Sequence, residues 1–420
     1  MPDTSAQLAE LKKRIASIDA RFASKPTPRI EPQPVDWHWT AEDFLHGDVV
    51  ENHWGEHFQT ERLFPAHKRH GSSDVGALNE LPEKFLSSLA ADTIPHVRPQ
   101  KWAFLDTETT GLAGGCGTYA FLVGIGRITA AGFTVRQFLM RDFGEEESLL
   151  AAIDAHLRDF DVLVTYNGKT YDQPLLETRY RMVRQKPPFA RLGHLDLLHG
   201  ARNLWKLRFE SCRLVELERQ ILGFEREGDL PGDLIPYVYF EYVRSREAAR
   251  LVPIFHHNAM DILTLACLTA IVPAAFHSID PDALAQAGVR RGEDLAGIAR
   301  WLLRAQRHEQ ALDVSKRAVK AGLPDGLLFR MLWDIALLEK KLHAAQAAAE
   351  RFIELASCRN EYRVPALEEL AKYYEHRAKD CPAALAHTKQ ALGYRQSAAL
   401  ERRKARLERR LAKVQAQPSL

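Results

Sequence analysis

Two carboxylates spaced two residues apart are the first candidates for chemistry in the sequence. Asp106 and Glu108 follow the apolar residues 103–105, which predict a buried strand. Side chains at positions i and i+2 of a strand point to one face, so the two carboxylates converge. Because like charges at the end of a buried strand repel each other, they indicate a bound cation or proton rather than an exposed acidic strand end.

Two further acids lie far along the chain. Asp172 follows a predicted strand over 161–168 and stands near the start of a predicted helix, where it could also serve as a helix cap. Asp261 lies in an apolar stretch of a predicted helix, and a carboxylate there needs a partner. His257 stands four residues before Asp261 and shares its helix face, whereas His256 stands five residues before it.

Together these side chains predict one kind of chemistry. Hard cations such as Mg²⁺ take oxygen ligands and retain several water molecules. Two such ions about 3.5–4 Å apart can hold the attacking and leaving oxygens of a phosphodiester displacement. A neighbouring histidine with a near-neutral pKa can accept the proton of the attacking water. The acids therefore predict metal-dependent hydrolysis of a phosphodiester.

The elements that must position these residues alternate between strands and helices. The patterns predict, in chain order, an antiparallel three-stranded meander over 101–143, a helix over 145–160, a strand over 161–168, a helix over 171–183, a strand and turn within 194–205, and helices over 211–224 and 253–275. By analogy, this order is typical of a ribonuclease H-like α/β fold, a mixed sheet flanked by helices.

After residue 284 the strand patterns stop and helical patterns come in pairs. The pairs are 292–306 with 309–321, 325–340 with 342–356, and 363–377 with 381–394. Taking Ala311, Ala345 and Ala384 as equivalent gives periods of 34 and 39 residues, the first of which is the tetratricopeptide period. We therefore expect an all-α tetratricopeptide-like repeat domain.

These patterns divide the chain into five parts. We expect an N-terminal helix and linker over 1–35, a partly irregular extension over 36–99, a ribonuclease H-like domain over 100–278, helical repeats over 284–398 and a basic tail over 399–420. In the extension, His53 and His57 have a spacing that a metal site can use, but polar loops and a small hairpin are the better interpretation.

The distribution of charge and of cysteines indicates the cellular location of the protein and the kind of partner that it binds. The net charge of the 420 residues is only +2, but the chain from residue 284 carries 26 basic and 16 acidic side chains, which suggests contact with an anion. The stretch 401–414 is either a solvated basic helix or an anion-binding one. The five cysteines are scattered and form no CxxC pair, the N-terminus is polar, and there is no apolar run of about 20 residues. We therefore expect a cytoplasmic protein without a membrane partner.

Three motifs resemble a known family. DTETTGL (106–112), YNGKTYD (166–172) and HNAMD (257–261), in this order, resemble the exonuclease motifs of the DEDD, or DnaQ-like, superfamily. GLAGGCGTYAFLVGIG (111–126) and HLDLLHGARNLWK (194–206) are similar to its YprB-type ribonuclease H-like branch. The resemblance covers about residues 100–275. It implies a 3′–5′ exonuclease that hydrolyses DNA or RNA with two Mg²⁺ or Mn²⁺ ions.

The resemblance also implies roles for single residues. The implied metal ligands are Asp106, Glu108, Asp172 and Asp261. The general base is a histidine four or five positions before the last aspartate, so His257 and His256 both qualify, and the shared helix face favours His257. Thr109 and Leu112 would contact the terminal nucleotide and Asn167 would shape the site, although turn chemistry or core packing explains each equally well. For His194 and Asp196 we expect structural hydrogen bonds.

Two other functions are compatible with the same sequence. A non-catalytic adaptor would use the repeats to bind a protein and the sheet as a scaffold, but a scaffold has little use for carboxylates that repel each other. A structure-selective endonuclease would use the same fold and metal ions. Under the leading hypothesis the partner is a single-stranded DNA or RNA end, with a protein partner possible through the repeats.

Overall fold

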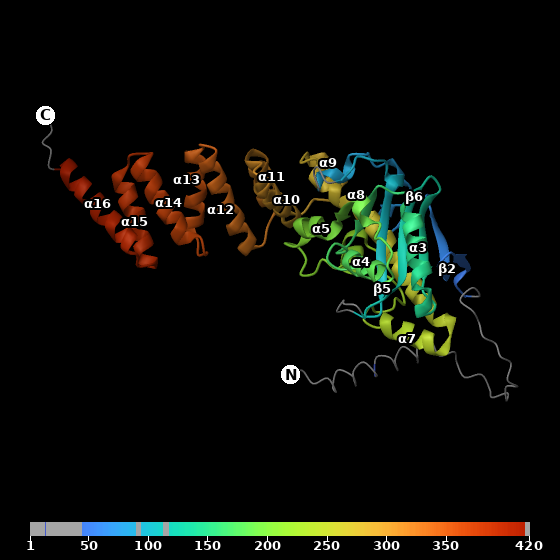
Figure 1. The fold of residues 1–420 in the computed structure, drawn as a ribbon. Coiled ribbons are helices and arrows are strands. Elements are labelled where there is room, and N and C mark those ends of the chain that lie inside the picture. The colour runs from blue at the N-terminus through green and yellow to red at the C-terminus, as the bar shows by residue number, and fades with distance from the viewer. Residues whose placement is uncertain (1–12, 14–43, 90–93, 112–116, 416–420) are drawn as a thin grey trace, which may run out of the picture. The chain divides into compact units, whose positions relative to one another are not determined.

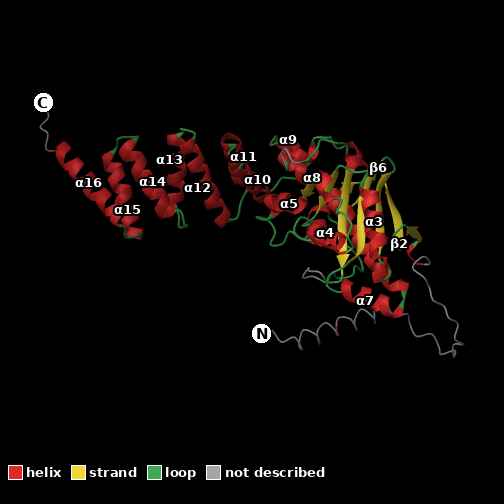
Figure 2. Cartoon of the chain, viewed as in Figure 1, coloured by secondary structure: helices red, strands yellow, loops and turns green. Residues whose placement is uncertain are grey.

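A computed structural model describes residues 13, 44–89, 94–111 and 117–415 (Figures 1 and 2). The chain divides into two units, residues 1–38 and residues 39–420. The predicted N-terminal helix and linker lie almost wholly outside the described residues, and so does Leu112. The account below concerns the second unit.

A seven-stranded mixed sheet forms the centre of the first half of this unit, in the order β1-β2-β7-β6-β5-β8-β9. Its strands are β1 (Gly47–Asn52), β2 (Gly55–Pro65), β5 (Trp102–Thr109), β6 (Ala120–Thr129), β7 (Gly132–Leu139), β8 (Val162–Thr165) and β9 (Gly193–Asp196). Strands β5, β8 and β9 run parallel, and the other neighbours pair antiparallel. The meander β5-β6-β7 is therefore the one that the sequence predicts.

The sheet begins earlier in the chain than we expected. The sequence suggests a separate, partly irregular extension over 36–99, but β1 and β2 form a hairpin whose second strand pairs with β7 from Phe58 to Pro65. A second, two-stranded sheet, β3 (Arg69–His70) and β4 (Ser73–Asp74), follows. His57 is buried, and its Nδ1 lies 2.9 Å from Ser148 Oγ, which makes it a packing residue.

Helices cover both faces of the sheet (Figure 1). They are α3 (Glu146–Leu157), α4 (Asp172–Met182), α5 (Leu197–Trp205), α6 (Leu214–Leu217), α7 (Ile235–Ser245), α8 (Val252–His277) and α9 (Pro281–Gln286). Helix α3 packs on β2 and β7, while α8 packs on β5, β6 and β7 and also contacts α5. The sequence did not predict α7, and it predicted only a turn where α5 forms.

Helix α8 is the central core helix. Together with the turn before it, it is the one stretch of the described residues long and apolar enough to cross a membrane by length and composition, but 78% of its most apolar window is buried inside the fold. A glycine on β6 allows its close approach, because a Cβ at Gly124 would stand 2.2 Å from Asn258 Oδ1 and 2.3 Å from Ile262 Cδ1. This contact brings α8 close to the acidic end of β5.

The second half of the unit contains only helices among its described residues. These are α10 (Gly292–Arg304), α11 (His308–Ala321), α12 (Asp325–Lys341), α13 (Ala345–Ser357), α14 (Arg363–His376), α15 (Cys381–Tyr394) and α16 (Ala398–Gln415). Each helix packs against the next, as the three predicted pairs require. The mixed sheet flanked by helices and the helical C-terminal region confirm the fold class expected from the sequence.

The repeat register differs from the predicted one. The fourth residues of α11, α13 and α15 are the buried alanines Ala311, Ala348 and Ala384, so the equivalent alanine is Ala348 and not Ala345. The left-handed residues that end the first helix of each pair have the same spacing: Gln306 (φ 61°), His343 (φ 64°) and Lys379 (φ 58°). The repeats are thus 37 and 36 residues apart. The choice of Ala345 was wrong because several alanines stand side by side in the stretch 344–349.

The basic stretch after residue 399 is the last packed helix of the array. Leu400 and Leu407 of α16 are buried. Arg403, Arg406 and Arg410 all donate hydrogen bonds to Glu375, whose side chain is 1% exposed. Three of the basic side chains therefore have a structural role.

The two halves of the unit share one hydrophobic core. A single cluster of buried side chains includes residues of β5, β8, α5 and α8 together with residues of α10, α11 and α12. Helix α10 approaches α5 so closely that a Cβ at Gly297 would stand 2.3 Å from the carbonyl oxygen of Asn203. Arg208 also donates to the buried Asp294 at 3.2 Å.

Candidate active site

Three elements bring the four predicted acids to the carboxyl end of β5. Asp106 and Glu108 lie on β5, Asp172 is the first residue of α4, and Asp261 lies on α8. Phe104, two residues before Asp106, belongs to the core cluster with α8, so Asp106 and Glu108 share the α8 face of the sheet.

Three of these acids have pKa values above those of ordinary carboxyl groups. Burial and the charges of Asp261 and Asp172 raise the pKa of Asp106 well above its ordinary value. Burial and the charges of Asp106, Asp261, Asp172 and Asp229 do the same to the pKa of Glu108. Burial, with a smaller contribution from Asp196, raises the pKa of Asp172 to about 6 although Thr107 donates to it. The acids therefore lie close enough to repel one another.

Polar neighbours orient these acids without neutralising them. Asn258 Nδ2 donates to Asp106 Oδ2 at 2.9 Å, and Thr107 Oγ1 donates to Asp172 Oδ1 at 2.5 Å. Glu108 is 9% exposed, and in the described part of the chain it has neither a side-chain hydrogen bond nor an ion pair. Among the described residues no lysine or arginine forms an ion pair with Asp106, Glu108 or Asp172. Their negative charge is therefore uncompensated.

Asp261 has different surroundings, which the sequence did not reveal. Arg226 Nη2 donates to Asp261 Oδ1 at 2.5 Å, Nε donates to Glu218 Oε2 at 2.6 Å, and Nη1 lies 3.3 Å from Asp229 Oδ2. The Arg226 side chain is only 2% exposed. We expected Asp261 to be a metal ligand, but one of its carboxylate oxygens belongs to this internal ion pair.

The Arg226 cluster continues away from the site. Glu218 Oε1 lies 2.9 Å from His70 Nε2 and accepts a hydrogen bond from Thr264. Although burial alone would raise the pKa of Glu218, His70 and Arg226 bring it below its ordinary value. A buried polar network thus runs from β3 to the site, and each of its carboxylates has a partner.

The structure separates the two candidate histidines. His257 is 8% exposed; its Nδ1 lies 2.9 and 3.0 Å from the two carboxylate oxygens of Asp229, and its Nε2 lies 3.6 Å from Asp261 Oδ2. Burial lowers the pKa of His257, but the hydrogen bond to Asp229 and the charge of Asp261 outweigh it and raise the pKa overall. His256 is half-buried, and its Nδ1 lies 3.4 Å from Arg62 Nη1. Only His257 reaches the acids.

The donor set suits a hard divalent cation without enclosing one. Carboxylate oxygens that repel each other are the ligands such an ion prefers. As the side chains stand, no three His, Cys, Asp or Glu residues in the described ranges come close enough together to hold a metal ion. Water and a substrate phosphate would complete the ligand shell, as they commonly do around Mg²⁺.

Two of the predicted substrate-contact residues, Thr109 and Asn167, have structural hydrogen bonds, and the third, Leu112, lies outside the described residues. Thr109 Oγ1 donates to the carbonyl oxygen of Gly111 at 2.9 Å and lies 3.1 Å from the Tyr171 hydroxyl. Asn167 adopts a left-handed conformation with φ 69° at the end of β8, and its N–H donates to Asp196 Oδ1 at 2.8 Å.

His194 and Asp196 make the structural hydrogen bonds that we expected. Asp196 also caps the start of α5 through the N–H of Leu198. His194 lies between Thr165 and Gln173, and burial together with Lys169 lowers its pKa to about 4.

Comparison with known proteins agrees with this geometry. A family model described as the RNase_H superfamily matches residues 103–273. A Bacillus subtilis (strain 168) protein named "Uncharacterized protein YprB" is 33% identical over 334 residues, which are 78% of this chain and 78% of the relative. The chain belongs to this YprB family of the ribonuclease H superfamily. The matched range spans all four acids and His257, and this membership confirms the resemblance to the YprB-type ribonuclease H-like branch.

Sequence reasoning missed three residues of this YprB-family site. Asp229 and Arg226 lie in the irregular segment between α6 and α7, where no periodicity points to a site. Asn258 stands inside the third motif, but its reach to Asp106 depends on the space left by Gly124 on another strand. These contacts come from segments far apart in the chain, and short motifs do not encode them.

Proposed function

We propose that the protein is a metal-dependent nuclease that removes nucleotides from the 3′ end of a DNA or RNA strand. Membership of the ribonuclease H superfamily suggests nuclease activity and nucleic-acid binding. One observation carries the proposal: Asp106, Glu108 and Asp172 share one end of the sheet, repel one another and have no basic partner among the described residues. A scaffold gains nothing from such an arrangement, whereas a metal site requires it.

The proposed metal ligands are Asp106, Glu108, Asp172 and the oxygen of Asp261 that Arg226 leaves available. Two Mg²⁺ or Mn²⁺ ions bound there would supply a nucleophilic water and stabilise the leaving 3′ oxygen. Arg226 holds Asp261 in place, and Asn258 holds Asp106. Burial and mutual repulsion raise the pKa values of Asp106 and Glu108, which fits this role because a bound cation favours the charged form of both groups.

His257 is the proposed general base. With Asp229 accepting the proton on Nδ1, Nε2 faces the acids and can accept a proton from the attacking water. The same carboxylates stabilise the imidazolium that forms, which agrees with the raised pKa of His257. Thr109 and Leu112 remain the proposed contacts to the terminal nucleotide.

Two features of the proposal concern the rest of the chain. The helical pairs are proposed to form a tetratricopeptide-like module that binds substrate or a protein partner. A cytoplasmic location is also proposed, since none of the four cysteines among the described residues forms a disulfide.

A strand-degradation assay tests the proposal. Single-stranded DNA and RNA labelled at the 5′ end are incubated with the full-length protein and either Mg²⁺ or Mn²⁺. We expect the strands to shorten progressively from the 3′ end, and Asp106→Asn to lower the rate at least about a hundredfold. His257→Gln should lose activity, whereas its neighbour His256→Gln, which does not reach the acids, should retain it.

Three outcomes would contradict parts of the proposal. Absence of degradation on every substrate, with parent and Asp106→Asn alike, favours a non-catalytic adaptor. Cleavage that ignores a chemically blocked 3′ end favours an endonuclease on the same fold. Equal loss in His256→Gln and His257→Gln removes His257 from the role of base.

A further inference from the structure

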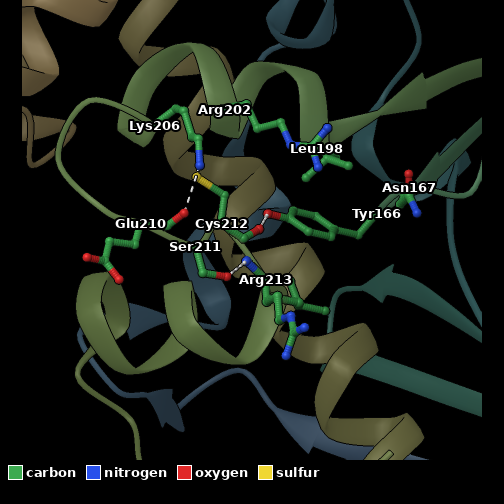
Figure 3. Close-up of a pocket in the computed structure, with 10 residues that line it drawn as sticks. Tyr166, Asn167, Leu198, Arg202, Lys206, Glu210, Ser211, Cys212 and Arg213 are labelled. Carbon is green, nitrogen blue, oxygen red and sulfur yellow. Dashed lines mark hydrogen bonds between the residues drawn. The ribbon is translucent and has the colours of Figure 1, made fainter. Parts of the chain in front are cut away.

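A polar cavity lies beside the carboxyl ends of β8 and β9. Its volume is about 380 Å³, and its walls come from the end of β8, from α5 and from the segment 210–214 (Figure 3). Arg202 lines it from α5, Lys206 from the residue that follows α5, and Arg213 from the segment 210–214. The Tyr166 hydroxyl forms part of the wall and donates to the carbonyl oxygen of Cys212.

The cations of this cavity lack carboxylate partners. No ion pair to Arg202, Lys206 or Arg213 exists within the described ranges, although most arginines elsewhere on the sheet domain are paired, such as Arg136 with Glu61 and Arg158 with Asp154. Lys206 Nζ donates at 2.7 Å to a backbone oxygen, that of Glu210. Glu210 is the one carboxylate among the lining residues, so three cations face one anion.

The cavity and the acids occupy the same end and the same face of the sheet. Asn167 follows β8 and Leu198 follows β9, while Glu108 is the next-to-last residue of β5, and these three strands are parallel neighbours. Neighbouring strands are about 4.8 Å apart, so the backbone of β8 lies one strand spacing from the backbone of β5, which carries Asp106 and Glu108. Residues of α5 and α8 share one core cluster with Phe104, which places the cavity on the face of Asp106 and Glu108.

We propose that this cavity binds backbone phosphates of the single strand whose end enters the acidic site, with Arg202 and Arg213 as the phosphate contacts. The inference rests on the proposed nuclease function and extends it by a substrate-binding subsite. Guanidinium groups donate paired hydrogen bonds that match phosphate oxygens. Unpaired cations at the same end of the sheet as the unpaired acids give the strand an anchor and the metal ions a position.

The composition of the cavity favours phosphate over a base. Base binding to single strands uses exposed aromatic rings for stacking. Tyr166 is the single aromatic residue in the lining, and its hydroxyl is tied to the chain at Cys212. The lining therefore recognises charge rather than sequence, and binding should be strongly salt-dependent.

Strand binding without divalent ions tests the subsite separately from catalysis. Fluorescence anisotropy with labelled single strands gives the Kd at several salt concentrations for the full-length parent, for the double variant Arg202→Gln/Arg213→Gln and for the control Lys186→Gln. Lys186 is an exposed cation in the loop after α4 and does not line the cavity. We expect the double variant to bind at least about tenfold more weakly. Its plot of log K against log salt should be flatter by about 0.7 for each lost phosphate contact.

The outcomes distinguish this subsite from the proposed function. A double variant that binds with the parent's Kd and salt slope overturns the subsite even if the parent degrades strands. If the parent degrades no strand and yet binds strands through Arg202 and Arg213, the result supports the subsite and contradicts the nuclease function. Two results together would overturn a strand subsite: millimolar inorganic phosphate displaces the strand completely, and a dinucleotide binds as tightly as a twelve-nucleotide strand. They would show that the cavity binds an isolated phosphate group. Because both arginines are exposed and unpaired, the melting temperature should stay at the parent value.

Discussion

Two buried glutamates in this chain have opposite surroundings. Glu108 lies near the end of β5 among other acids and has no neutralising partner in the described ranges, and both burial and its neighbours raise its pKa. Glu375 lies on α14 and accepts hydrogen bonds from α16; burial alone would raise its pKa, but Arg406 and Arg403 bring it below the ordinary value. A buried glutamate therefore stabilises the helical array as the centre of an ion-pair cluster, whereas another buried glutamate is a destabilising charge in the sheet domain.

The difference separates structural acids from functional ones. A buried carboxylate with its own arginines completes the fold, whereas one without them leaves a charge that an external ion can neutralise. Arg226 shows both conditions within one site, because it neutralises Glu218 and Asp261 while Asp106 and Glu108 stay uncompensated. Of the four acids of the site, Asp261 is thus neutralised in advance.

Removal of Arg226 should give the largest change in stability. Arg226→Leu leaves Glu218, Asp229 and Asp261 as buried charges without their cation, so the free energy of unfolding should fall by roughly 3–5 kcal/mol in urea titrations. Arg226→Lys should recover only part of the loss, since an ammonium group does not present a planar fork to three carboxylates. Millimolar Mg²⁺ should stabilise Arg226→Leu more than the parent. Parent-like stability of Arg226→Leu would show that the ion pairs contribute little.

Glu375→Gln should have the next largest effect, and it should leave the sheet domain intact. The substitution removes the acceptor that holds Arg403, Arg406 and Arg410, so we expect a loss of about 2 kcal/mol. The pKa of Glu375 is lowered, so its stabilisation is present above the unfolded value near 4.5 and is lost as the pH falls through the folded pKa. The loss measured in Glu375→Gln should therefore shrink in acid. Strand degradation at saturating substrate should not change.

Glu108→Gln should have the smallest effect and the opposite sign. The pKa of Glu108 is raised, so the group is tolerated below its unfolded value near 4.5 and destabilises the fold as the pH rises through the folded pKa. In the absence of metal, Glu108→Gln should stabilise the protein by on the order of 1 kcal/mol at neutral pH, and the gain should disappear near pH 4. Saturating Mg²⁺ should cancel the gain, because only the parent offers the full ligand set. If both glutamine variants lose stability with the same pH dependence, the contrast between the two glutamates is wrong.

The sequence predicted the parts of the molecule that depend on local pattern. Hydrophobic periodicity located the strands β5 to β8 and the paired helices, and the spacing of Asp106 and Glu108 placed them on one face. Those inferences hold because a strand or helix fixes the direction of its own side chains.

The rest depends on contacts between distant segments. The hairpin of β1 and β2 joins β7 across about 70 residues, and Arg226 meets Asp261 from an irregular loop. The repeat register failed at Ala345 because several adjacent alanines fit the same pattern, and only the packing identified Ala348. Local sequence patterns therefore did not predict which distant strands pair, where the loop of Arg226 lies, or in which register the repeats pack.

The close approach of α10 to α5 has a practical consequence for dissecting the molecule. Because the buried cluster continues from α8 through α5 into the first helical hairpin, a truncation after residue 283 would expose apolar surface and leave Arg208 without Asp294. Such a fragment should aggregate or melt early, whatever its catalytic residues do. Loss of activity on shortening the chain there would report a broken fold, and the role of the helical array is better tested by substitutions on its surface.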